Sequence, residues 1–141
     1  MADQTPRIVV DTNVFVGSAY NPRSASRKIV TACLQGNLRL CASPATLREY
    51  NLIFSRAIRN PQQRDQLLAL VHQACQVKPA ETPRVVPADP QDDKFVAVAL
   101  AAHALALITN DQGVLEVGSH EGITIQRPAA FLETWSDQQH S

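Results

Sequence analysis

Acidic residues occupy places in this chain where a strand is predicted to end or a helix to begin. Asp11 directly follows one apolar run, Asp111 closes another, Asp93 with its neighbour Asp92 opens a helical stretch, and Glu49 lies one turn into a helix. Carboxylates that are brought together repel each other unless a cation holds them. Oxygen ligands with no histidine or cysteine cluster nearby suit Mg²⁺ or Mn²⁺. These residue types therefore predict a metal site that activates water against a phosphodiester.

Each acid also has an ordinary structural interpretation, and these alternatives stay open on the sequence alone. Asp92 or Asp93 can cap a helix, Asp111 can form a turn or a cap, and Glu49 can be a solvated helix residue. Asp11 is harder to explain in this way, because a charge at the end of a buried strand needs a partner.

The elements that must position these acids alternate along the chain. Ser43-Pro44 and Asn60-Pro61 are helix start signals. The predicted strands are 7–10, 38–42, a weak one at 85–86, 105–108 and 122–125. The predicted helices are 23–35, 44–56, one beginning at 61, 92–104, a short one beginning at 114, and 128–135. This order predicts an α/β fold of three layers (α/β/α) with a central parallel sheet of about five strands. Ligands of such sheets bind beyond the carboxyl ends of the strands, where the acids stand.

Length and composition favour one soluble domain. The chain has 141 residues, of which 45% are hydrophobic and 18% charged, and these values argue against disorder. We expect a single domain over 1–141, with a core of about 7–135 and frayed ends. The sequence shows no membrane span or signal peptide, and its three scattered cysteines favour reduced thiols in a cytoplasmic protein.

Charge is distributed unevenly along the chain. Residues 1–64 hold nine Lys or Arg against three Asp or Glu, and residues 65–141 hold four against ten. One sign of charge concentrated in half of the chain can form a surface for polyanions. Solvated faces in both halves would explain the same numbers.

The ordered set of motifs resembles a known family. The residues that carry the resemblance are Val9–Phe15 (VVDTNVF), Leu47–Tyr50 (LREY), Asp89–Phe95 (DPQDDKF), Ala97–Ala102 and Ile108–Asp111 (ITND) with Leu115, followed by Ile123–Ile125, Pro128, Phe131 and Leu132. From about Arg7 to Trp135 the chain looks like a PIN-domain ribonuclease. More specifically, it looks like the bacterial branch of toxins from toxin–antitoxin pairs, related to VapC-type toxins.

The resemblance implies roles for individual residues. Asp11, Glu49, Asp93 and Asp111 resemble the family's catalytic, metal-binding acids, and Asp92 remains an adjacent candidate for the third. Three further residues resemble the small polar side chains that hold such carboxylates in place: Thr12, Asn13 and Thr109. The chain departs from the family at two positions that often hold glycine, His103 and Asn110.

The expected activity is metal-dependent hydrolysis of RNA phosphodiester bonds with Mg²⁺ or Mn²⁺ as cofactor. Basic side chains that could contact the RNA backbone are Arg23, Arg27, Lys28 and Arg48. The resemblance also implies a small antitoxin partner and a homodimer or higher oligomer. One alternative is a PIN-like module that binds RNA or protein without catalysis. A haloacid-dehalogenase-like phosphatase and a phospho-receiver domain are disfavoured, the former because Asn13 stands where that family needs an acid.

Overall fold

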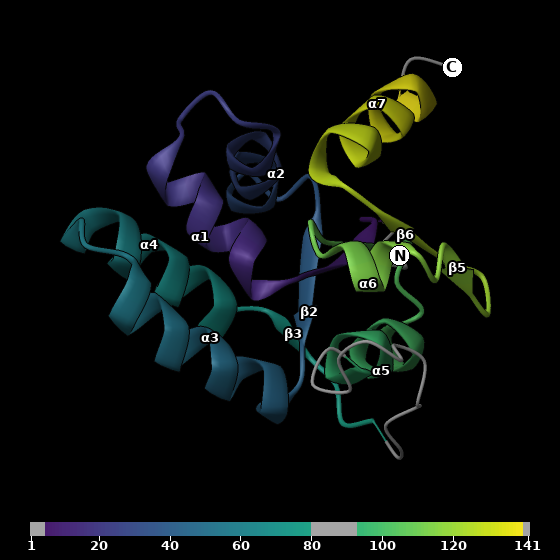
Figure 1. Ribbon diagram of the computed structural model, residues 1–141, viewed down its shortest axis with the longest axis horizontal. Coiled ribbons are helices and arrows are strands. Elements are labelled where there is room, and N and C mark those ends of the chain that lie inside the picture. The colour runs from purple at the N-terminus through teal and green to yellow at the C-terminus, as the bar shows by residue number, and fades with distance from the viewer. Residues whose placement is uncertain (1–4, 80–92, 140–141) are drawn as a thin grey trace.

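A six-stranded sheet forms the centre of the computed structural model, which describes residues 5–79 and 93–139 (Figure 1). The strand order is β3-β2-β1-β4-β6-β5, and all neighbours are parallel except β5 and β6. The strands are β1 (Arg7–Val10), β2 (Arg39–Ala42), β3 (Cys75–Gln76), β4 (Ala106–Ile108), β5 (Ser119–His120) and β6 (Ile123–Gln126).

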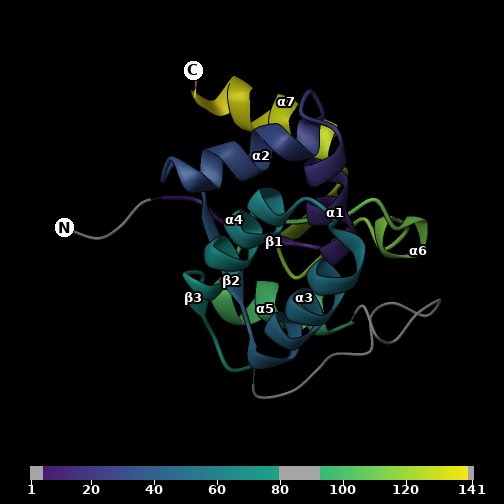
Figure 2. The same ribbon diagram turned by 90° about the vertical axis from the view of Figure 1, so that its left-hand side faces the viewer.

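Helices cover both faces of this sheet. They are α1 (Thr12–Tyr20), α2 (Ala25–Leu34), α3 (Pro44–Ala57), α4 (Pro61–His72), α5 (Asp93–Ala102), α6 (Gln112–Leu115) and α7 (Pro128–Gln139). Helices α1 to α4 gather on one side of the sheet and α5 lies on the other (Figures 1 and 2), while α7 packs against α2 and β4. The predicted three-layer α/β fold is confirmed.

The predicted start signals of two helices act as expected. Ser43 Oγ accepts a hydrogen bond from the backbone N–H of Thr46 at 3.2 Å, and Pro44 is the first residue of α3. Asn60 Oδ1 accepts from the N–H of Gln63 at 3.0 Å at the start of α4. Each cap satisfies a backbone donor that the helix itself leaves without a partner.

Several elements differ from the sequence-based prediction. Helix α1 was not expected, because Val14 and Val16 are β-branched and Gly17 is a poor helix former; packing against α2 and α3 overrides these preferences. The third strand is Cys75–Gln76, and the weak strand predicted at 85–86 lies outside the described residues.

The edge of the sheet also departs from the all-parallel prediction. Strand β5 pairs antiparallel with β6 through a two-residue turn at Glu121 and Gly122, with φ values of 48° and 87°. Positive φ at both turn residues matches the right-handed twist of a tight hairpin. Because β5 has only two residues, it shows no alternating pattern that sequence analysis could detect.

Aromatic rings hold together the elements at the carboxyl end of β1. The Tyr50 ring lies 5.3 Å from Phe15, 5.6 Å from Phe54 and 6.1 Å from Phe95, measured between centroids. Its hydroxyl donates to the carbonyl oxygen of Val10, the last residue of β1. The cluster therefore connects α1, α3 and α5 to the central strand.

The three cysteines are unpaired, as the sequence predicts. Cys33, Cys41 and Cys75 are free thiols, and burial raises the pKa of Cys33 to about 12. Among the described residues, no helix is both long and apolar enough to cross a bilayer.

The aromatic cluster predicts a strong dependence of stability on Phe54. Phe54 is 0% exposed, so Phe54→Ala leaves a cavity and should lower the free energy of unfolding by about 3–5 kcal/mol. The matched control is Leu52→Ala on the same helix, where Leu52 is 49% exposed and the change should stay below about 1 kcal/mol. Urea denaturation of both variants measures the difference, and similar losses would contradict this account of the core.

Candidate active site

The register of two parallel strands places Asp11 beside Thr109. Val10 of β1 pairs with Ile108 of β4, so the next residue of each strand leaves the sheet at the same level. The backbone N–H of Asp11 donates to the carbonyl oxygen of Ile108 at 2.9 Å, and Thr109 Oγ1 donates to Asp11 Oδ2 at 2.7 Å. Thr109 is fully buried and Asp11 is only 7% exposed. The Asp11 carboxylate is therefore held in one orientation at the centre of the carboxyl edge.

Glu49 is held from both sides. Thr12 Oγ1, at the start of α1, donates to Glu49 Oε2, and Lys94 Nζ, in α5, lies 2.6 Å from Glu49 Oε1. Both partners of this ion pair are half-buried. Glu49 is thus no solvated helix residue: it joins α1, α3 and α5.

The third predicted acid opens α5. Asp93 is the first residue of this helix and is only 3% exposed. The ion pair of its neighbour Lys94 with Glu49 places this end of α5 beside α3. Asp92, the adjacent candidate, lies outside the described residues.

Asp111 caps a helix and also approaches Asp11. Its Oδ1 atom accepts hydrogen bonds from the backbone N–H groups of Gly113 at 2.8 Å and Val114 at 3.3 Å, at the start of α6. Its own N–H donates to Thr109 Oγ1 at 3.0 Å. The Thr109 hydroxyl therefore links Asp11 and Asp111. Asp111 both caps α6 and is tied to Asp11 through this hydroxyl.

The electrostatics of Asp11 reflect its burial and the acidic groups around it. Burial raises the pKa of Asp11 above the ordinary value of 3.8, and the charges of Glu49 and Asp111 raise it further, while the hydrogen bonds from Thr109 and Thr12 oppose the rise. Burial, together with the charges of Asp11 and Glu49, also raises the pKa of Tyr50. Asp11, Glu49 and Asp111 are close enough for their charges to interact.

The chemical type of these side chains suits a hard cation such as Mg²⁺. Carboxylate oxygens are the ligands that Mg²⁺ and Mn²⁺ prefer, and a buried carboxylate with a raised pKa gains from a neighbouring positive charge. Within residues 5–79 and 93–139, however, no three His, Cys, Asp or Glu side chains come close enough together to hold a metal ion. In this arrangement the ammonium of Lys94 offsets the charge of Glu49.

The remaining predicted site residues come from α1, from α2 and the segment before it, and from α3. Asn13 is exposed on the first turn of α1. Arg27 donates from Nε to the carbonyl oxygen of Ser18 at 2.7 Å and thereby caps the end of α1. Arg23, between α1 and α2, and Lys28, in α2, are exposed, and Arg48 is exposed in α3 beside Glu49 in the chain.

Two residues of the site were missed from the sequence. Lys94 stands inside the DPQDDKF motif, but only the folded chain shows that it pairs with Glu49. Tyr50 stands inside the LREY motif, and its hydroxyl anchors α3 to β1. Motif membership was the available signal for both.

His103 stands at a position where the family often has glycine, and its backbone adopts a conformation that glycine reaches more easily than other residues. Its φ is 52°, immediately after the end of α5. Helices commonly end in this left-handed conformation, most often at glycine. Asn110 is exposed, and its carbonyl oxygen accepts from Arg127 Nη1 at 3.4 Å.

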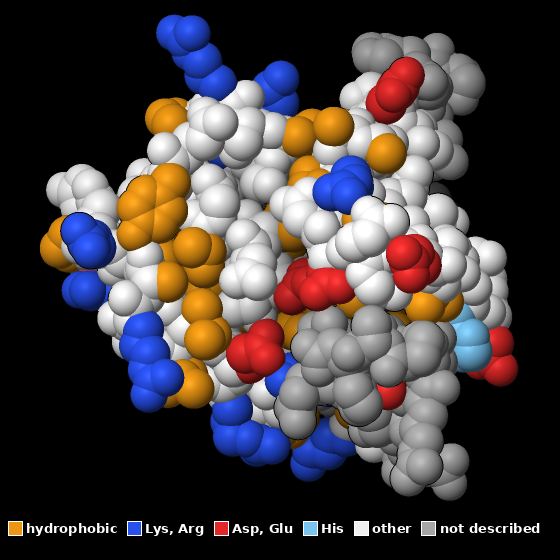
Figure 3. Space-filling model, in the orientation of Figure 1, with side chains coloured by type: hydrophobic (Ala, Val, Ile, Leu, Met, Phe, Trp, Pro, Cys, Tyr) orange, Lys and Arg blue, Asp and Glu red, His pale blue; other side chains and the backbone are white. Residues whose placement is uncertain are grey.

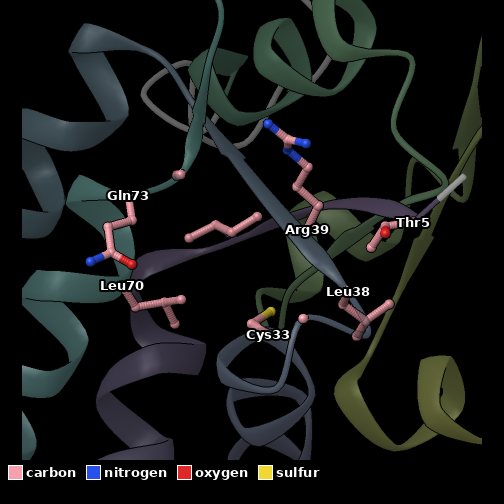
Figure 4. A pocket seen from close by; sticks show the side chains of 9 residues that line it. Thr5, Cys33, Leu38, Arg39, Leu70 and Gln73 are labelled. Atoms are coloured by element: carbon pink, nitrogen blue, oxygen red, sulfur yellow. The ribbon is translucent and has the colours of Figure 1, made fainter. Parts of the chain in front are cut away.

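A separate hollow of about 260 Å³ lies at the other edge of the sheet (Figure 4). Its lining includes Cys33, Leu38 and Arg39 from the end of α2 and the start of β2, together with Leu70 and Gln73 from α4 and the residue after it. The acids follow the ends of strands, whereas this hollow lies where β2 begins. It therefore belongs to a different part of the molecule.

The raised pKa of Asp11 predicts a pH-dependent stability effect. The folded state binds the Asp11 proton more tightly than the unfolded state, so this contribution to stability is present below pH 3.8 and is lost as pH rises through the folded pKa. Asp11→Asn should therefore raise the free energy of unfolding at about pH 7 without divalent ions. The gain should shrink toward about pH 4.

Urea denaturation in EDTA at both pH values measures this effect. Asp65→Asn is the matched control, since the Asp65 side chain is 74% exposed. An Asp11→Asn variant no more stable than the control at neutral pH would contradict the proposed cost of the buried charge.

Comparison with known proteins places this arrangement in a family. The family described as PIN domain matches residues 7–113, which run from β1 into α6 and include all four predicted acids. No curated protein matches the chain. The match covers well over half of the chain, which therefore belongs to the PIN domain family, whose members are generally nucleases.

Proposed function

We propose that the protein is a metal-dependent ribonuclease that hydrolyses RNA phosphodiester bonds. The observation that carries the proposal is the buried Asp11 carboxylate, which lies at the carboxyl end of the central strand with Glu49 and Asp111 close enough to raise its pKa. Burial and the neighbouring acids disfavour the ionised form of Asp11, and a cation bound beside it would stabilise that form.

The four predicted acids are the proposed metal ligands, and neighbouring side chains position them. Asp11, Glu49, Asp93 and Asp111 would hold Mg²⁺ or Mn²⁺, which when bound lowers the pKa of water and offsets charge on the phosphate. Thr109 orients Asp11 and the backbone of Asp111, and Thr12 and Lys94 hold Glu49. These contacts hold the Asp11 and Glu49 carboxylates in place, and a bound cation would have to draw the acids closer together than they lie here.

The proposed biological role is that of the toxin in a toxin–antitoxin pair. It rests on the motifs that the chain shares with VapC-type toxins, and it includes a cytoplasmic location, a small antitoxin protein and a homodimer or higher oligomer. A small reading frame upstream of the gene, whose product co-purifies with this chain and inhibits it, would support the role. Light scattering after size exclusion measures the oligomer.

RNA cleavage tests the activity directly. Structured and single-stranded RNAs are incubated with wild type, Asp11→Asn and the exposed control Asp65→Asn, each with Mg²⁺, Mn²⁺ or EDTA. We expect cleavage by wild type and Asp65→Asn with either metal, and none in EDTA or with Asp11→Asn. Undiminished cleavage by folded Asp11→Asn would refute the assignment, and RNA binding without cleavage by any protein would favour the non-catalytic module.

The Thr109 hydroxyl is expected to position the acids for catalysis. Thr109→Val removes the donor to Asp11 and the acceptor for the Asp111 N–H, and it should lower the cleavage rate about 10- to 100-fold. Thr109→Ser keeps the hydroxyl and should retain most of the activity. Equal rates for the two variants, with matching circular dichroism spectra, would show that the hydroxyl has no such role.

A further inference from the structure

A basic hollow lies between the start of α3 and α5. It has a volume of about 250 Å³, and its lining includes Arg48, Lys78 and Lys94, together with Ser43, which caps α3, and Ala45 of its first turn. The described residues of its lining include no acidic side chain. Three cations therefore line the hollow, and one of them, Lys94, is paired with Glu49.

Two of these cations are available to a ligand. Arg48 and Lys78 are exposed, and neither forms an ion pair within the described part of the chain. The 14-residue helix α3 points its N-terminus at the same hollow and adds positive partial charge there. Arginine and lysine side chains that converge on one hollow favour a compact anion, and an arginine fork matches the oxygens of phosphate.

The third cation joins the hollow to the acidic residues. Lys94 lines the hollow, and its Nζ atom lies 2.6 Å from Glu49 Oε1. Arg48 and Glu49 are also consecutive residues of α3. Figure 3 shows this juxtaposition on the surface: acidic side chains occupy the middle of the face, and Lys and Arg side chains gather below them, over the start of α3.

We propose that this basic hollow binds a backbone phosphate of the RNA, adjacent to the phosphate at the acidic site. The inference rests on the proposed ribonuclease function and adds a binding subsite to it. An RNA strand carries one phosphate per nucleotide, so a strand that reaches the acids must place a further phosphate nearby. Cations beside the acids offset the repulsion that those acids exert on the strand. An acidic protein segment is the less favoured ligand, because its carboxylates do not recur at a fixed distance from a group bound at the acidic site.

The experiment measures binding without requiring cleavage. Wild type, Arg48→Gln, Lys78→Gln and the double variant are titrated in EDTA against a fluorescein-labelled single-stranded RNA and, separately, against fluorescein-labelled polyglutamate. Anisotropy is the readout over a range of KCl concentrations. A gel confirms that the RNA stays intact. The matched control is Arg59→Gln, because Arg59 is an exposed arginine just beyond the other end of α3.

We expect each variant of the hollow to bind RNA about fivefold more weakly, and the double variant more weakly still. Each lost phosphate contact should also reduce the slope of log Kd against log salt by about 0.7. Arg59→Gln should bind like wild type. Circular dichroism spectra that match wild type show that the exposed substitutions leave the fold intact.

Three results would overturn the proposal. They are equal affinity of the hollow variants and the control, no binding of RNA by wild type at low salt, and weakened binding of polyglutamate but not of RNA. Failure of the ribonuclease proposal is a separate outcome, since it appears as absent cleavage with Mg²⁺ or Mn²⁺ while the binding contrast among the variants persists.

Discussion

The Asp11 carboxylate at the end of the central strand is the constraint around which this structure is organised. A carboxylate that is 7% exposed loses most of its hydration, and burial therefore raises its pKa. The Thr109 hydroxyl and the start of α1 offset part of that cost, and both are placed by the register of β1 with β4. Shifting this pairing by one residue would exchange the faces of the strand and remove the partner from the acid.

The aromatic cluster beneath the acids explains how distant segments stay in place. Tyr50 packs its ring on Phe15, Phe54 and Phe95, and its hydroxyl bonds to the end of β1. Because Glu49 precedes Tyr50 in α3, anchoring the tyrosine also fixes where the glutamate can reach. The apolar core therefore positions Glu49 together with its ion pair to Lys94 and its hydrogen bond from Thr12.

Charges of both signs lie next to each other at this edge. Arg48 and Glu49 are neighbours in α3, and Lys94 follows Asp93 in α5. Each helix therefore contributes one acid to the acidic side and one cation to the basic hollow. Charged residues from both halves of the chain meet here, because parallel strands bring segments from both halves to the same edge.

The sequence by itself determined the alternation of strands and helices, the caps at Ser43 and Asn60, and the placement of acids after strands, because these depend on local patterns of few residues. Tertiary structure alone decided helix α1, the short strands β3 and β5, and the Lys94–Glu49 pair. Helix α1 forms against its own propensities by packing, and a two-residue strand has no period to detect. An ion pair between residues 45 positions apart exists only once two helices meet across the end of a sheet.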